Sequence, residues 1–83
     1  MSKPAVRTYH VLATWDPEAE VWVAESDDVI GLVAEAATIE ALIAKLRVLI
    51  PELLELNGQI EAGVFDVPIE VLARYEDRLR LTA

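Results

Sequence analysis

One stretch, residues 38–57, constrains the fold more than any other part of the chain. Its aliphatic side chains recur at the i, i+3, i+4, i+7 spacing of one helical face, and most of its charged side chains fall off that stripe. The apolar positions are Ile39, Leu42, Ile43, Leu46, Leu49, Ile50 and Leu53. Because such a stripe must be covered by the rest of the chain, the sequence predicts one core helix.

Both ends of this helix are marked by local signals. Thr38 is suited to accept a hydrogen bond from a free amide of the first turn, and Glu40 places a negative charge near the positive end of the helix dipole. Asn57 and Gly58 form a pair suited to a left-handed stop. Pro51 removes one backbone hydrogen bond, yet the apolar register continues on both sides of it. We therefore expect one helix over residues 38–57.

The residues before the helix have the pattern of three strands. Val6–Trp15 is rich in β-branched and aromatic residues that alternate between two faces, and Val21–Glu25 resumes this pattern after the turn residues Asp16–Glu20. Residues 26–31 form a polar connection, and Leu32–Ala36 is short and apolar enough for a third strand. The first half therefore predicts a three-strand meander that leads into the helix.

The residues after the helix fit two patterns. Val64–Leu81 can be written as a helix with a face broken by charge, or as a strand, and alternation fits better over Val67–Tyr75. A strand that returns to the sheet after a helix is expected beside the first strand and parallel to it. The predicted fold class is thus α+β, with the order βββαβ, one mixed sheet and a single helix packed on one face.

The length and composition predict one small domain. Residues 1–83 are too few for two domains, and we expect residues 1–5 to be a disordered tail. The hydrophobic share of 54% is high enough for a core. There are no cysteines, which excludes disulfides and cysteine-ligated metals. A four-stranded sheet leaves two unpaired edges, and one helix cannot cover all of the apolar surface. We therefore expect a homo-oligomer, most simply a dimer.

The charge balance limits the partners. Fifteen acidic and seven basic residues give a net charge of −8, so nucleic acid and anionic lipid should be repelled and a basic protein favoured. Arg74, Arg78 and Arg80 cluster, but Glu76 and Asp77 lie between them, which favours a solvated or subunit-contacting edge over a DNA-binding one. The N-terminal residues lack a signal-peptide core, and no stretch has the ~20 apolar residues of a membrane span. These features predict a soluble cytoplasmic protein.

The candidate chemical groups all have structural interpretations. A metal-dependent nuclease would need several converging carboxylates, and the candidates are Asp16, Asp27, Asp28, Glu35 and Glu40. Asp16 is better explained as a turn residue, Asp27 and Asp28 as part of a solvated loop, and Glu40 as a charge at the helix end. His10 is the only histidine, and Trp15 with Trp22 fits cross-strand packing. We therefore expect no catalytic residue, no metal and no cofactor.

Several segments together resemble a known family. The segments are Val21–Val29, with its Trp-Val-Ala-x-Ser-Asp-Asp core, Gly31–Ala36 with Gly-Leu-x-x-Glu-Ala, and Leu49–Asn57 with Ile-Pro-Glu-Leu. Over residues 6–75 the chain resembles the small bacterial HicB-like domains, in particular a short stand-alone branch described only as a domain of unknown function. The resemblance implies a truncated RNase H-like fold. Many members of the wider family are antitoxins that cover a small basic ribonuclease toxin, and many carry a C-terminal DNA-binding element, for which this chain has no room after the fourth strand.

The resemblance and the charge together lead to a functional hypothesis. We expect a non-catalytic, protein-binding module, such as the antitoxin of a type II toxin–antitoxin pair, that neutralises a basic toxin by covering it. Acidic side chains would attract the partner and neighbouring apolar side chains would hold it. The predicted partner-binding residues are Trp22, Glu25, Asp27, Asp28, Leu32 and Glu35. The alternatives are an orphan structural or regulatory homodimer without a toxin and, third, a degenerate RNase H-like nuclease.

Overall fold

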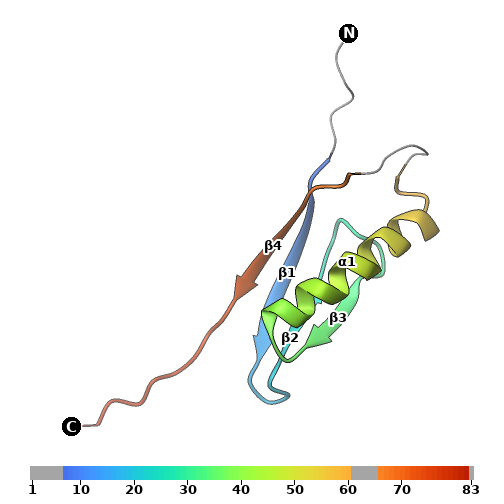
Figure 1. Cartoon of the computed structure of the whole chain (residues 1–83). Coiled ribbons are helices and arrows are strands. Elements are labelled where there is room, and N and C mark those ends of the chain that lie inside the picture. The colour runs from blue at the N-terminus through green and yellow to red at the C-terminus, as the bar shows by residue number, and fades with distance from the viewer. Residues whose placement is uncertain (1–6, 61–65, 83) are drawn as a thin grey trace.

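The protein has one four-stranded sheet and one helix, in the predicted order βββαβ (Figure 1). The structure, a computed structural model, describes residues 7–60 and 66–82, so the predicted tail at residues 1–5 lies outside the described residues. The elements are β1 (Tyr9–Asp16), β2 (Val21–Glu25), β3 (Val33–Ala36), α1 (Ile39–Leu56) and β4 (Ile69–Arg74). The α+β class and the mixed sheet are confirmed.

The sheet has the strand order β3-β2-β1-β4. The β1–β2 and β2–β3 pairs are antiparallel, with Ala13 opposite Ala24 and Ala24 opposite Ala34. The β4 strand is parallel to β1, with Val11 opposite Val71. The prediction that the fourth strand lies beside the first and parallel to it is therefore confirmed, and β4 forms one edge of the sheet.

The ends of α1 follow the predicted signals. The Thr38 hydroxyl accepts a hydrogen bond from the Ala41 amide at 3.0 Å, which satisfies one of the free donors of the first turn. After α1, Gly58 has a φ of +63°, in the left-handed region that favours glycine. Pro51 lies inside the helix without ending it. Within residues 7–60 and 66–82, no helix is long and apolar enough to cross a membrane.

The core lies between α1 and one face of the sheet. The fully buried side of the helix follows an i+4 row, Leu42, Leu46, Ile50 and Leu54. The sheet contributes Tyr9, Val11, Ala13, Ala24, Ala34 and Ala36, and the connection before β3 adds Val29 and Leu32. The small alanine side chains allow α1 to lie close over β2 and β3 (Figure 1). The edge strand β4 is less covered, because its helix-facing side chains Ile69 and Val71 are only half-buried.

The boundaries of two strands differ from the sequence-based ones. β1 begins at Tyr9, the residue where pairing with β4 starts, and Arg7 and Thr8 are not part of it; the predicted start at Val6 lies outside the described residues. Leu32 belongs to a turn rather than to β3, because its amide donates to the carbonyl of Val29 at 3.2 Å and Gly31 before it has a φ of +79°. Its side chain is nevertheless in the core. The turn, and not the strand, therefore carries this apolar residue inward.

Candidate protein-binding surface

The connection between β2 and β3 is built around the hydroxyl of Ser26. Ser26 Oγ donates to the carbonyl of His10 on β1 at 2.6 Å and accepts from the amides of Asp28 and Val29, each at 3.0 Å. A hydroxyl can act as donor and acceptor at once, so this one side chain closes the turn and fixes it to β1. The connection, residues 26–31, therefore has a defined position at the end of the sheet.

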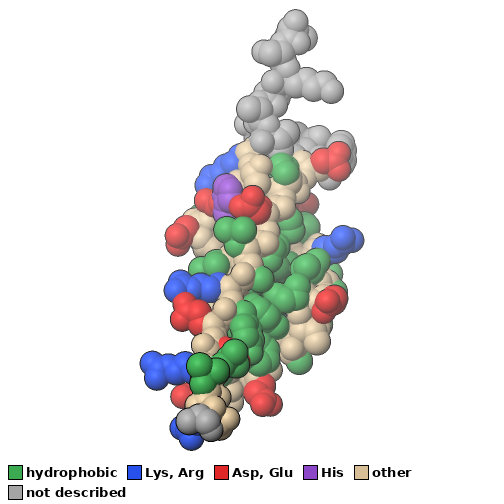
Figure 2. All heavy atoms as spheres, turned by 90° about the vertical axis from the view of Figure 1, so that its left-hand side faces the viewer, with side chains coloured by type: hydrophobic (Ala, Val, Ile, Leu, Met, Phe, Trp, Pro, Cys, Tyr) green, Lys and Arg blue, Asp and Glu red, His purple; other side chains and the backbone are tan. Residues whose placement is uncertain are grey.

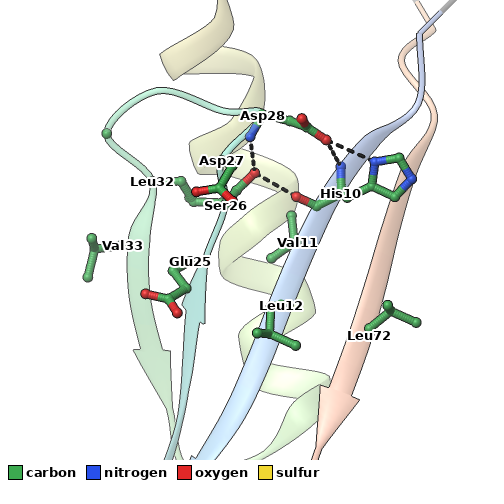
Figure 3. A pocket seen from close by; sticks show the side chains of 11 residues that line it. His10, Val11, Leu12, Glu25, Ser26, Asp27, Asp28, Leu32, Val33 and Leu72 are labelled. Atoms are coloured by element: carbon green, nitrogen blue, oxygen red, sulfur yellow. Dashed lines mark hydrogen bonds and ion pairs between the residues drawn. The ribbon is translucent and has the colours of Figure 1, made fainter.

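Asp28 extends this attachment to the beginning of β1. Its carboxylate accepts hydrogen bonds from the His10 amide at 2.7 Å and from the Arg7 guanidinium at 2.7 Å, and the His10 ring nitrogen Nδ1 lies 2.9 Å from Asp28 Oδ2 (Figure 3). Together the His10 main chain, the His10 ring and Arg7 hold the pKa of the Asp28 carboxyl below its ordinary value of 3.8. The negatively charged carboxylate of Asp28 therefore serves to attach the connection to β1.

The C-terminal end of α1 holds the same connection from the other side. The Gln59 side chain donates to the carbonyl of Asp28 at 2.8 Å and accepts from the amide of Ile30 at 3.0 Å. Asn57 Nδ2 donates to the carbonyl of Ile30 at 2.9 Å. Hydrogen bonds from two sides therefore fix the backbone of residues 26–31, and the side chain of Asp27 within this segment is exposed to solvent.

The sheet has an outer face, opposite to α1, on which apolar and acidic side chains lie side by side. The strand register aligns Val33, Glu25, Leu12 and Leu72 in one row across all four strands. Val33 is 75% exposed, Leu72 57% and Leu12 37%. We call this row, together with Asp27, the outer-face patch. It borders a shallow hollow of about 620 Å³, and Figure 3 shows Glu25 between Val33 and Leu12 with α1 behind the sheet.

The structure divides the six predicted partner-binding residues. Glu25, Asp27 and Asp28 line the hollow together, although the carboxylate of Asp28 is occupied by His10 and Arg7. Glu35 is also exposed on the outer face; it lies on β3, two residues after Val33, and opposite Val23 of β2.

The other two predicted residues are not available on this surface. Leu32 is only 3% exposed and belongs to the core, so it supports the hollow from below. Trp22 packs against the core on the helix-facing side of the sheet. The grouping of Trp22 with the acidic residues was wrong, because residues three positions apart in a strand, such as Trp22 and Glu25, point to opposite faces.

Sequence reasoning missed the apolar members of the outer-face patch. Leu12 and Leu72 lie sixty positions apart in the chain and become neighbours only through the parallel β1–β4 pair. Strand alternation could have identified Val33, because its side chain and that of the buried Ala34 point to opposite faces of the sheet. His10 is also on the outer face, with Nε2 3.9 Å from a carboxylate oxygen of Glu70.

The carboxylates considered for a nuclease site lie on separate elements. Asp16 caps the β1–β2 turn, accepting from the amides of Glu18 and Ala19 at 3.0 and 3.2 Å, which confirms the turn interpretation. Glu40 lies in the first turn of α1. Within residues 7–60 and 66–82, no three histidine or carboxylate side chains lie together as metal ligands. The arrangement of the described carboxylates therefore gives no support to a two-metal centre.

The two tryptophans pack across the hairpin, as predicted. Trp15 is directly opposite Trp22, and their ring centroids are 5.5 Å apart. Tyr75, just after β4, joins them at centroid distances of 6.0 and 6.1 Å. This aromatic cluster lies on the helix-facing side of the sheet, where β4 ends.

Comparison with known proteins identifies the family. The family model described as "Domain of unknown function (DUF1902)" matches residues 8–83. The chain belongs to the DUF1902 family. No curated protein matches it. Among solved structures, this DUF1902 chain is similar to the crystal structure of a hypothetical protein, TTHA1013, from the extremely thermophilic bacterium Thermus thermophilus. The two are 49% identical with a TM-score of 0.63, and the match covers 90% of this chain and 100% of the other.

Proposed function

We propose that this DUF1902 domain is a non-catalytic protein-binding module related to the HicB-like antitoxins, with a truncated RNase H-like fold. Its partner would be a small basic protein, and the function would be to cover that partner's cationic surface. In a type II toxin–antitoxin pair, the partner would be a small basic ribonuclease. The proposal rests on the resemblance of Val21–Val29 and Leu49–Asn57 to HicB-like domains and on the surface described above.

The outer-face patch is the observation that supports this function most directly. Val33, Leu12 and Leu72 are accessible apolar groups on a flat, hydrogen-bonded sheet, and Glu25 and Asp27 provide negative charge beside them. Apolar contact supplies affinity at the centre of an interface, while surrounding charge mainly raises the association rate and selects partners of opposite sign. The net charge of −8 acts in the same direction over a longer range.

Occlusion requires no moving part in the domain. The anchored connection at residues 26–31 and the paired strands hold Glu25 and Asp27 in fixed positions, so little conformational entropy is lost when a partner binds. The partner's basic surface, which a ribonuclease needs for its RNA substrate, would be neutralised and covered at once. Inhibition would therefore be stoichiometric and competitive with RNA.

The test uses the product of a neighbouring gene that encodes a small basic protein. Its RNA cleavage and its binding to the full chain would be measured together, by gel assay and by calorimetry. We expect an equimolar amount of the domain to stop cleavage. Combined Glu25→Lys and Asp27→Lys should weaken binding by about tenfold or more, whereas Glu52→Lys on the exposed side of α1 should not. Full inhibition by the double variant, or no binding by the parent, would refute the proposal.

A further inference from the structure

The outer edge of β4 is the part of this fold that most clearly lacks a neighbour. In residues 7–60 and 66–82, β1 pairs with one side of β4 and no strand pairs with the other. The chain then runs on from the end of β4 away from the sheet (Figure 1), and we call residues 75–82 the C-terminal arm. Leu79 is 85% exposed and Leu81 91% exposed. An unpaired edge that continues into an exposed apolar arm is unfavourable for an isolated molecule.

The arm continues the two-sided pattern of β4. Val71, Tyr75, Leu79 and Leu81 are separated by even numbers of residues, as are Glu70, Arg74, Glu76 and Arg80, so an extended arm has one apolar and one charged side. Figure 2, which views this edge, shows hydrophobic side chains gathered on one side of the exposed strand and charged side chains on the other. If extended, the arm would therefore be amphipathic, with Asp77 as the one charged residue on its apolar side.

The apolar side of this edge adjoins an open groove. The groove lies between α1 and β4, has a volume of about 970 Å³, and is lined mainly by aliphatic side chains. Ile43, Leu46 and Ile50 form the α1 wall, and Ile69 and Val71 form the β4 wall. Ile69 and Val71 are only half-buried within their own chain. A strand added to β4 would place its inward side chains beside this groove.

We propose that the occupant is the C-terminal arm of a second copy of this chain, paired antiparallel with β4 about a two-fold axis at Tyr75. Two such edges would join two four-stranded sheets into one continuous sheet, and both arms would be paired along their length. Residues directly opposite in an antiparallel pair share a face. The arrangement therefore makes definite predictions about which side chains meet.

On the charged face this register is self-complementary. Arg74 of one copy is opposite Glu76 of the other, and Glu70 is opposite Arg80, so the two-fold axis generates each ion pair twice. Within one chain Arg74 already bonds Glu76 through Nε at 2.9 Å, so these groups lie together at the proposed axis. Leu72 is opposite Arg78, whose aliphatic stem can lie beside it on the outer face without covering it.

On the apolar face, the same register delivers the exposed leucines to the groove. Leu79 of the second copy is opposite Val71, and Leu81 is opposite Ile69, so both reach the β4 wall of the groove. Tyr75 meets its own copy at the axis, next to Trp15 and Trp22. Asp77 falls opposite Ala73, where it keeps its hydrogen bond from the Tyr75 hydroxyl at 3.0 Å.

Neighbouring registers are disfavoured by charge. Moving the axis by one residue toward the N-terminus places Arg74 opposite Arg74 of the second copy. Moving it by one residue toward the C-terminus places Glu76 opposite Glu76 and Arg74 opposite Arg78. Like charges directly opposite each other destabilise a strand pair. Of these three registers, the charges in residues 69–81 therefore favour the one whose two-fold axis lies at Tyr75.

The first test is a charge reversal measured by analytical ultracentrifugation of the full chain. We expect the parent to be a dimer of twice 9.2 kDa at micromolar concentration. Glu70→Arg alone, or Arg80→Glu alone, should raise the dimer dissociation constant about tenfold or more, because two ion pairs become two like-charge contacts. The two changes together should restore dimerisation. Glu52→Arg is a matched control, since it makes the same charge change on an exposed position of α1.

The second test measures the register by cross-linking in a chain that contains no cysteine. Tyr75→Cys places two thiols opposite each other at the axis and should give a covalent dimer on mild oxidation. Arg78→Cys should not, because the two copies of this position lie several residues apart along the paired strands. A monomeric parent, a double charge reversal that fails to recover, or cross-linking through position 78 would each overturn the proposal. These tests do not depend on any toxin, so they stand apart from the outer-face function.

Discussion

Leu42 and Leu46 lie one turn apart on the buried side of α1, and truncating them should destabilise the protein by different amounts. Both side chains have no accessible surface. Leu46 also forms part of the groove wall beside β4, whereas the residues that line this groove do not include Leu42. The space left by Leu46→Ala is therefore continuous with the groove, and neighbouring atoms or water can fill it. Leu42 has no accessible surface and does not line this groove, so we expect the space left by Leu42→Ala to stay enclosed.

The expected sizes follow from this difference. Leucine-to-alanine changes in cores cost about 2–5 kcal/mol, with the higher values where the cavity cannot collapse. We therefore expect about 2–3 kcal/mol for Leu46→Ala and about 3–5 kcal/mol for Leu42→Ala. A domain of this length has a total free energy of unfolding of about 4–12 kcal/mol, so either change removes a large part of it.

Urea unfolding followed by circular dichroism, at one protein concentration for all variants, measures these costs. The concentration must be fixed because self-association adds to apparent stability. Val48→Ala is the control: Val48 lies on the same helix, is 60% exposed, and should change the free energy by less than about 0.5 kcal/mol. If Leu46→Ala resembles this control, the assigned helix register is wrong. If Leu46→Ala costs more than Leu42→Ala, the role of the groove is refuted.

Three further measurements test other parts of the structure. Because hydrogen bonds from the His10 main chain and ring, with Arg7, lower the folded-state pKa of Asp28, its stabilising contribution is present above its unfolded value of 3.8 and is lost as the pH falls through the lower folded value. Urea midpoints from pH 7 to 3 should therefore fall less steeply for Asp28→Asn than for the parent, and parallel curves would contradict this. Thr38→Ala should cost about 1 kcal/mol through loss of the cap bond to Ala41, whereas Thr38→Ser should keep most of it; equal losses would argue against capping. The protein should not shift its own promoter fragment at about 150 mM salt, because its basic residues neutralise few phosphates; a shift competed only by that fragment would disprove this.

The sequence predicted the elements better than it predicted their contacts. The helical stripe was visible from Ile39 to Leu53, but the row that becomes fully inaccessible continues to Leu54, and Leu53 is half-buried. Which of two adjacent leucines points inward depends on how the helix crosses the sheet. Local pattern alone does not contain this information.

The candidate surface shows the same division. Glu25, Asp27 and Asp28 are close in the chain, so sequence reasoning could group them, and the structure does bring them to one hollow. Leu12 and Leu72 meet through a strand pair formed after a helical crossover, which no short-range signal reveals. The misplacement of Trp22 was avoidable, because strand parity alone separates it from Glu25.

The position of β4 has a consequence for how the protein folds. Tyr9 and Ile69 are sixty positions apart, so the β1–β4 pair closes the longest loop in the sheet and carries the highest entropic cost of closure. The β1–β2 hairpin, β3 and α1 are joined by short connections and have emerged from the ribosome before β4. During synthesis, β1 therefore passes through a stage in which the edge that will receive β4 is open. In the monomer, before a second copy pairs with this edge, amide protons of β4 should be the first in the sheet to exchange with solvent, since an edge strand held by one neighbour opens at a low free energy.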